Sequence, residues 1–253
     1  MDSIVKMYPD MEAAYQYLQN SPEVNALLEE ANKIAMGRLR YNDHGPVHSH
    51  IVARNALIIH ELLEEAGIEH TMISEGCSRF MSRLVTFTGA YLHDVGNGVH
   101  RELHYVWSPI ITRDVLKDMA NHLGMNTSER TMFVARVMEV MYTHDESVKC
   151  LSTEGGCVTV ADGTDMAEGR ARAPYEVGKM DIHSISALAI SKVHLDRGRE
   201  KPISITVEMN SRAGIFQVQN VLGEKIRSSG LMDLIEIYYR HNPSKTEGRI
   251  LLE

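Results

Sequence analysis

Several histidines and aspartates in this sequence occupy positions where a folded helix would bury an apolar side chain. His48 and His144 each lie four residues from a valine on an apolar helical face, so each ring is expected to point into the core. His93 follows an apolar helix and is joined directly to Asp94. A buried imidazole needs partners for both ring nitrogens, and a buried carboxylate needs a cation. These residues therefore indicate either a hydrogen-bonded core or a bound metal ion.

Asp162 raises the same question farther along the chain. It follows the apolar run Val158–Ala161, which predicts an internal position for its carboxylate. A divalent cation accepts neutral imidazoles and carboxylates as ligands and offsets the buried negative charge. A single buried histidine is usually a hydrogen-bonded core residue, but this set of side chains in predicted helices favours a metal site.

The segments around these residues resemble the HD-domain metal-dependent phosphohydrolases. The resemblance is carried by Tyr91–Gly96 (YLHDVG), by His48–Ala53 (HSHIVA) and by Val160–Asp165 (VADGTD), and it covers roughly residues 40–175. The dipeptide His-Asp alone is a weak signal, whereas the ordered set of His, His-Asp and Asp with apolar flanks is specific. The resemblance implies a helical bundle of the HD type and an enzyme that hydrolyses a small phosphate ester or a nucleotide.

The same resemblance implies the ligands of two divalent ions, which could be Mn, Fe, Ni, Zn or Mg. The implied ligands are His48, His93, Asp94, His104, His144 and Asp162. Without the last two histidines the set would suit one ion, and with them Asp94 is the expected bridge between two. His100 competes with His104 for its place, and we favour His104 because it lies four residues before Ser108 on one helical face.

The family chemistry implies that a metal-bound hydroxide attacks phosphorus in line, while positive side chains stabilise the non-bridging oxygens. The predicted catalytic residues are Asp94, Asp145, Arg101 and Arg170. Arg101 follows the metal loop, and Asp145 would protonate the leaving group or orient a ligand. Arg170 lies eight residues after Asp162 and shares its helical face if that helix continues.

Neighbouring residues complete this predicted site. Arg172 is a further candidate for binding phosphate, and Asp165 is expected to hold Arg170 or Arg172 in place. His44 and His50 flank the first ligand, and His50 is expected to point away from the face that carries it. Asn97 stands where the HD-GYP branch, which hydrolyses cyclic di-guanylate, has a lysine, so that branch's substrate is not implied.

Two other functions share this ligand inventory. HD-fold enzymes similar to myo-inositol oxygenase hold two irons with four histidines and two aspartates, and they activate oxygen. A non-catalytic sensor could also use the metal site for structure alone. An oxygenase needs iron and consumes oxygen, whereas a hydrolase should release phosphate without oxygen. An open coordination position on the metal would argue against the non-catalytic sensor.

Helices must position these residues, and apolar residues recur at helical spacing over the first two-thirds of the chain. The predicted helices cover residues 22–40, 48–66, 74–93, 108–123, 128–144 and 157–168. Turns such as Asp43–Pro46 and Gly96–Gly98 separate them.

The pattern changes after about residue 180. Alternating apolar residues predict strands within 185–195 and 203–207, joined by a turn at 196–200. A helix over 213–227, a last strand over 231–237 and a loose tail over 244–248 follow. The predicted fold is mainly α, with a helical metal-site domain (1–180) and a small strand-strand-helix-strand α/β domain (181–253). The second domain carries no catalytic pattern and could form a homodimer through an exposed strand.

Composition restricts the possible partners. The net charge of -8 argues against a protein that wraps nucleic acid. The sequence contains no stretch of eighteen apolar residues, so no membrane span is expected. The three cysteines form no disulfide framework or Cys-x-x-Cys motif, and the first residues lack the apolar run of a signal peptide. We therefore expect a cytoplasmic protein whose main partner is a small phosphate-containing substrate.

Overall fold

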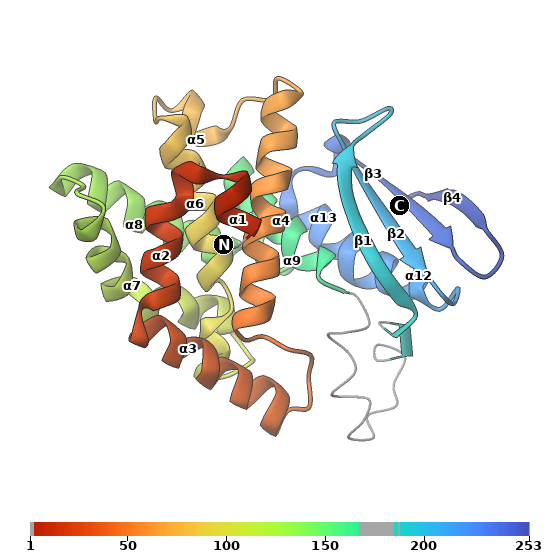
Figure 1. Cartoon of the computed structure of the whole chain (residues 1–253), viewed down its shortest axis with the longest axis horizontal. Coiled ribbons are helices and arrows are strands. Elements are labelled where there is room, and N and C mark those ends of the chain that lie inside the picture. The colour runs from red at the N-terminus through yellow and green to blue at the C-terminus, as the bar shows by residue number, and fades with distance from the viewer. Residues whose placement is uncertain (1–2, 167–184, 187, 253) are drawn as a thin grey trace.

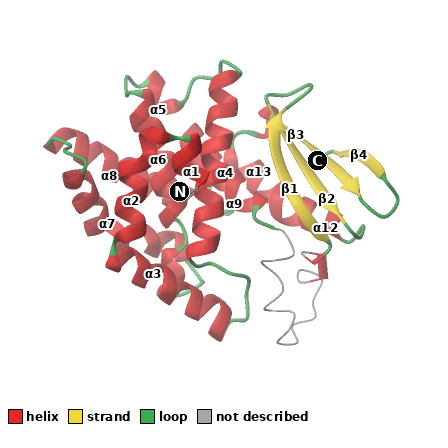
Figure 2. Ribbon diagram, in the orientation of Figure 1, coloured by secondary structure: helices red, strands yellow, loops and turns green. Residues whose placement is uncertain are grey.

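The protein is described here by a computed structural model that covers residues 3–166, 185–186 and 188–252. Helices make up most of these residues, and a small sheet lies at one end of the molecule (Figure 2). The mainly α prediction is therefore confirmed. No helix among the described residues combines the length and the apolar character needed to cross a membrane.

The helical part begins with a segment that the apolar pattern did not predict. Its elements are α1 (Ser3–Met7), a 3-10 turn (Pro9–Met11), α2 (Glu12–Asn20), α3 (Pro22–Asn32), a π-helical turn (Lys33–Arg38), α4 (Pro46–Glu65), α5 (Thr71–Ser74), α6 (Arg79–Leu92), a 3-10 turn (Val95–Gly98), α7 (His104–His122), α8 (Thr127–Thr143) and α9 (Thr153–Thr164). In Figure 1, α4, α6 and α9 lie in the centre, with α7 and α8 on one side and the sheet on the other.

Polar residues set the starts of the helices that carry the site. The hydroxyls of Ser78 and Ser152 accept backbone N–H groups at the first turns of α6 and α9. Asn126 and Glu129 form a capping box at the start of α8. These caps satisfy donors that would otherwise be unpaired, so the helix starts are fixed by local sequence.

The end of α9 differs from the prediction. The helix stops at Thr164, and Asp165 has left helical geometry with φ -83° and ψ 67°. The predicted continuation of this helix to residue 168 is therefore wrong. The prediction that placed Arg170 on the helical face of Asp162 required the helix to continue, so it is no longer supported. Arg170 and Arg172 lie outside the described residues.

The C-terminal unit contains the predicted strand-strand-helix-strand order and one more strand. Its elements are β1 (Ile190–Arg197), β2 (Ile203–Met209), α12 (Gly214–Gln217), a π-helical turn (Val218–Leu222), α13 (Gly223–Ser229), a 3-10 turn (Met232–Leu234), β3 (Ile235–His241) and β4 (Thr246–Ile250). The last predicted strand starts later than expected. The prediction of a loose tail is wrong, because residues 246–250 form β4 and pair with β3.

The sheet has the order β1-β2-β3-β4. β1 and β4 pair antiparallel with their neighbours, whereas β2 and β3 run parallel with Ile205 opposite Ile237. A parallel pair needs a crossover, and the segment from α12 to α13 supplies it. α13 lies between the sheet and α9 in Figure 1. Ile226 of α13 and Leu222 of the π-helical turn before it join the same apolar core as Val158.

Candidate metal centre

Six side chains predicted as metal ligands gather at the ends of five helical elements. We call this set the metal cluster, and it consists of His48, His93, Asp94, His104, His144 and Asp162. The four imidazole side chains are at most 4% exposed, and Asp162 is 13% exposed. The structure therefore brings together residues that lie up to 114 positions apart in the sequence, counting from 48 to 162.

Asp94 lies at the centre of the metal cluster and presents each carboxylate oxygen to a different pair of histidines. Its Oδ2 lies 3.3 Å from His48 Nε2 and 3.4 Å from His93 Nε2. Its Oδ1 lies 3.2 Å from His104 Nε2 and 3.7 Å from His144 Nε2. Both carboxylate oxygens of Asp94 therefore face imidazole nitrogens.

Asp162 completes the first of these groups. Its Oδ1 lies 3.2 Å from His48 Nε2 and 3.7 Å from His93 Nε2, and those two ring nitrogens are 3.2 Å apart. In the second group, the Nε2 atoms of His104 and His144 are 3.1 Å apart. The buried histidine and aspartate groups can therefore hold a metal ion.

The other nitrogen of each ring has an acceptor. The Nδ1 atoms of His93, His104 and His144 lie 2.8, 3.1 and 2.6 Å from the carbonyl oxygens of Ala90, Arg101 and Met141. His48 Nδ1 lies 2.7 Å from Asp165 Oδ2. A carbonyl oxygen can only accept, so Nδ1 carries a proton in those three rings and Nε2 is the ring nitrogen that faces the cluster. Metal-bound histidines are usually held in this way.

The electrostatics of the metal cluster favour ionised carboxylates. Burial raises the pKa of Asp94 and of Asp162, but the charges of His93 and Lys225 outweigh it and hold both pKa values well below their usual range. Burial lowers the pKa of His144 to about 4, so that ring is neutral near pH 7. Burial also disfavours charge on His93, but the charges of Asp94 and Asp162 outweigh it and raise the pKa of that ring instead. A divalent cation binds neutral imidazoles and ionised carboxylates, so its binding would displace the proton from His93 Nε2.

Asn97, Arg101 and Gly96 hold the loop that follows Asp94. Asn97 Nδ2 donates to Asp94 Oδ1 at 2.9 Å, so this residue supports the predicted bridge. Arg101 Nη1 lies 3.9 Å from the same oxygen, and its side chain is 36% exposed. A Cβ atom at Gly96 would lie 2.1 Å from the carbonyl oxygen of His104, so only glycine allows this loop to approach the start of α7.

The remaining predicted residues have other positions. Asp145 Oδ1 accepts from the backbone and hydroxyl of Ser147, and although burial raises its pKa, these bonds and Lys225 lower it overall. Asp145 is therefore ionised near neutral pH and is an acceptor rather than a proton donor there. His50 contacts Tyr15 edge to face, away from the metal cluster as predicted.

Three contributors were not identified from the sequence in their observed roles. His44 Nδ1 lies 2.6 Å from Asp94 Oδ2, and Asp165 binds His48. Lys225 from α13 forms an ion pair with Asp162 at 2.9 Å, although no residue of the C-terminal unit was among the predicted site residues. One signal was present for Lys225, since it lies three residues after Leu222 and one before Ile226, within an apolar helical face.

A second group of buried polar residues lies elsewhere, where His60 and His70 are neighbours of Glu64. We call His60 and His70 the stacked pair, because their rings are 3.6 Å apart and tilted by only 15°. Each ring nitrogen binds a ligand in the plane of its ring, so two face-to-face rings cannot both direct lone pairs at one ion. The stacked pair is therefore not a metal site in this geometry.

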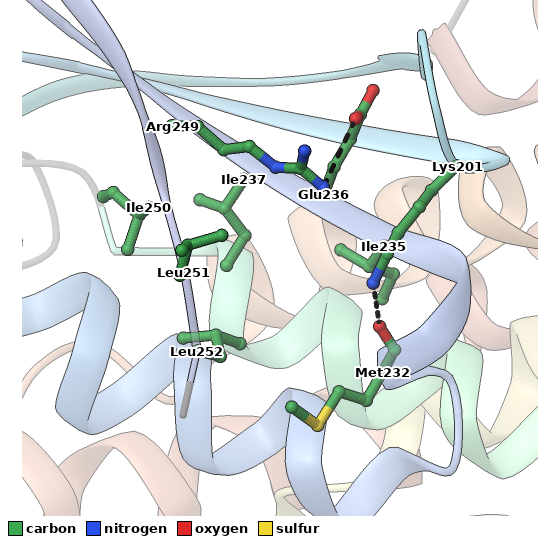
Figure 3. Close-up of a pocket in the computed structure, with 9 residues that line it drawn as sticks. All are labelled: Lys201, Met232, Ile235, Glu236, Ile237, Arg249, Ile250, Leu251 and Leu252. Carbon is green, nitrogen blue, oxygen red and sulfur yellow. Dashed lines mark hydrogen bonds and ion pairs between the residues drawn. The ribbon is translucent and has the colours of Figure 1, made fainter.

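A small pocket of about 90 Å³ lies in the C-terminal unit (Figure 3). Its lining residues are Lys201, Met232, Ile235, Glu236, Ile237, Arg249, Ile250, Leu251 and Leu252. Lys201 Nζ already donates to the Met232 carbonyl oxygen, and the pocket contains none of the metal cluster. The pocket is therefore separate from the metal cluster.

The chain is 40% identical over 232 residues to the uncharacterized protein MJ1020 of Methanocaldococcus jannaschii. The aligned region covers 91% of this chain and 89% of the relative. No family model and no solved structure matches the chain. Similarity at this level and over this length shows that the chain belongs to the same family as the MJ1020 protein.

Proposed function

We propose that this protein is a binuclear, metal-dependent phosphohydrolase of the HD type that acts on a small phosphate ester or nucleotide. One observation carries the proposal: four imidazole Nε2 atoms converge on the two oxygens of Asp94, while each Nδ1 is held by an acceptor. Imidazole and carboxylate ligands suit Mn, Fe, Ni and Zn better than they suit Mg, which prefers oxygen ligands.

The cluster divides into two ligand groups. His48, His93 and Asp162 would hold one ion, His104 and His144 would hold the other, and Asp94 would contribute one oxygen to each. Bound ions of this kind would lower the pKa of a coordinated water and stabilise negative charge on a phosphoryl oxygen.

The side chains of this protein supply the rest of the site. Arg101 is partly exposed beside Asp94 and His104, so its guanidinium can bind a phosphate oxygen that enters the site. Asn97 accepts from Arg101 at 3.2 Å while it donates to Asp94, which orients both groups. Asp165 holds the ring of His48 and keeps its Nε2 turned toward the cluster.

The test is metal analysis of protein purified without chelator, followed by a phosphate-release screen over nucleotides and sugar phosphates. We expect two ions per chain, and His104→Ala should leave one. His93→Ala should abolish phosphate release, whereas His194→Ala, the same change on β1, should not. Full turnover in His93→Ala, or a chain without metal, would contradict the proposal.

Chelation gives an independent measurement. A ligand that binds only the folded state stabilises it by about 2.7 kcal/mol at one hundred times its dissociation constant. We therefore expect chelator to lower the melting temperature of the wild-type protein, and an unchanged melting curve would argue against bound metal.

The same four histidines and two aspartates would also suit a di-iron oxygenase. Arg101 beside Asp94 favours an anionic phosphate substrate. Oxygen consumption by the iron-loaded protein, together with no phosphate release under anaerobic conditions with manganese, would favour the oxygenase instead.

A further inference from the structure

Lys225 is a buried cation that the C-terminal unit inserts beside the metal cluster. The residue is 7% exposed, and its Nζ has three acceptors within hydrogen-bond distance. These are Asp162 Oδ2 at 2.9 Å, Glu146 Oε2 at 3.0 Å and the His144 carbonyl oxygen at 2.8 Å. An ammonium group has three N–H donors, so this environment matches a charged lysine.

The packing of α13 on α9 brings Lys225 to this position. A Cβ atom at Gly163 would lie 3.1 Å from Leu222 Cδ1 and 3.2 Å from Lys225 Cβ, which is tighter than ordinary contact. The glycine therefore lets the lysine stem pass close to α9, next to Asp162. The backbone of Cys150 also donates to the Ser228 carbonyl oxygen at 2.9 Å, which joins α13 to the segment after His144.

The contacts of Asp162 divide between its two oxygens. Oδ2 is held by Lys225, whereas Oδ1 faces His48 Nε2 and His93 Nε2. A carboxylate can bind a cation through one oxygen or through both. An ammonium group on Oδ2 competes with the ion for that oxygen and leaves Oδ1 as the ligand.

We propose that Lys225 is a positioning residue that restricts Asp162 to ligation through one oxygen, so that the C-terminal unit is a structural component of the metal centre. This inference rests on the metal-dependent function proposed above. A carboxylate that uses one oxygen leaves a coordination position open on its ion, which a substrate or water can occupy. The C-terminal unit thereby affects the metal centre without contributing a ligand.

The experiment uses full-length protein loaded with Co²⁺, whose visible absorption weakens when its coordination number rises. Wild type is compared with Lys225→Met, which keeps the stem and removes the charge. Lys201→Met is the matched control, since its Nζ donates to Met232 in the same unit and does not reach the cluster. Metal content, Co²⁺ affinity and visible absorption of the bound Co²⁺ are measured for each.

In Lys225→Met we expect the absorption to weaken, because Lys225 no longer competes with the ion for Oδ2 of Asp162. The affinity should fall by about 10- to 100-fold, which is typical when a group that orients a ligand is lost. Lys201→Met should match wild type. Wild-type spectrum and affinity in Lys225→Met would overturn the inference, while a wild-type chain that binds no Co²⁺ would overturn the proposed function as well.

Glu146→Gln gives a second variant if Lys225→Met does not fold. Glu146 is half exposed, so its substitution should be tolerated, and it removes the negative charge from one of the three Lys225 acceptors while its amide oxygen can still accept. We expect a smaller change in absorption and affinity in the same direction. If Lys225→Met is unfolded and Glu146→Gln has the wild-type spectrum and affinity, the inference is wrong.

Discussion

The metal cluster and the stacked pair are both buried groups of histidines in the helical part, yet their rings are arranged differently. In the metal cluster, ring centroids lie 4.7–5.1 Å apart and neighbouring rings are steeply inclined. In the stacked pair, the rings lie face to face. Inclined rings can direct their lone pairs at a common point, whereas parallel rings cannot.

The partners of the ring nitrogens differ as well. His60 Nε2 lies 2.9 Å from the Ser82 hydroxyl, which donates in turn to Glu154 Oε1 at 2.6 Å. His70 Nε2 donates to the His60 carbonyl oxygen at 3.1 Å. These Nε2 atoms are therefore donors in a structural network, whereas the Nε2 atoms of the metal cluster face one another and the carboxylates of Asp94 and Asp162. Burial alone does not identify a candidate metal ligand, because the histidines of the two groups are equally buried and differ in where their ring nitrogens point.

The largest expected effect concerns Asp94, which distinguishes the metal cluster from any other buried group. Asp94→Asn removes the charge between the two ligand groups, and metal ions supply several kcal/mol of transition-state stabilisation. We expect phosphate release to fall by about 10³-fold, equivalent to about 4 kcal/mol. Steady-state kinetics with matched metal loading would check this, and a loss of less than tenfold would contradict the bridging role.

The next effect concerns Asp165, which orients His48 without belonging to the cluster. Asp165→Ala should weaken metal binding by about 10- to 100-fold, because the His48 ring loses the acceptor that fixes its orientation. Competition titration with a chromophoric chelator measures the affinity. Asp196→Ala, on an exposed part of β1, is the matched control. Equal affinities in the two variants would show that Asp165 does not position the ligand.

A substitution of Glu154 should affect stability and leave metal binding unchanged, because Glu154 belongs to the network of the stacked pair. Its carboxylate accepts from the Ser82 hydroxyl and the Met72 backbone, and the residue is fully buried. Glu154→Gln should lower the free energy of unfolding by about 1–3 kcal/mol, since the amide oxygen can replace Oε1 but the amide nitrogen cannot accept from the Thr153 hydroxyl that bonds to Oε2. Metal content should not change. Urea unfolding measures the loss of stability, and metal analysis measures the metal content. A loss of metal in Glu154→Gln would show that the network of the stacked pair also supports the metal cluster.

The smallest effect is a pH dependence from the stacked pair. Burial, together with His70 and Arg83, holds the pKa of His60 well below its ordinary value of 6.5. Below pH 6.5 the unfolded chain binds a proton that folded His60 does not, so the free energy of unfolding decreases as the pH falls, until the lowered pKa is reached. One such group contributes up to about 1.4 kcal/mol per pH unit.

His60→Gln should therefore show a shallower decrease in stability between about pH 6.5 and pH 5.5 than the wild-type protein, by about 1 kcal/mol. Urea unfolding with chelator present in both samples measures this difference and keeps metal binding out of the comparison. Parallel slopes would mean that folded His60 takes up a proton as readily as the unfolded chain does.

The helices could be predicted where apolar residues recur at helical spacing, as in α4 and α8, because one buried face is enough to specify such an element. The first twenty residues and β4 could not. α1 and α2 are short, and Gly248 in β4 lies against the ring of Tyr239, so that strand depends on a partner strand rather than on its own pattern.

The sequence by itself placed histidine and aspartate at the candidate ligand positions, because His48 and His144 lie on apolar helical faces and Asp162 follows an apolar run, and a helical fold must bury such segments. Tertiary structure alone decided that Asp165, His44 and Lys225 serve the same centre. Lys225 reaches Asp162 from 63 residues away, counting from 162 to 225. Such contacts depend on how α13 packs against α9, and no local pattern specifies the direction of an ammonium group or a ring nitrogen.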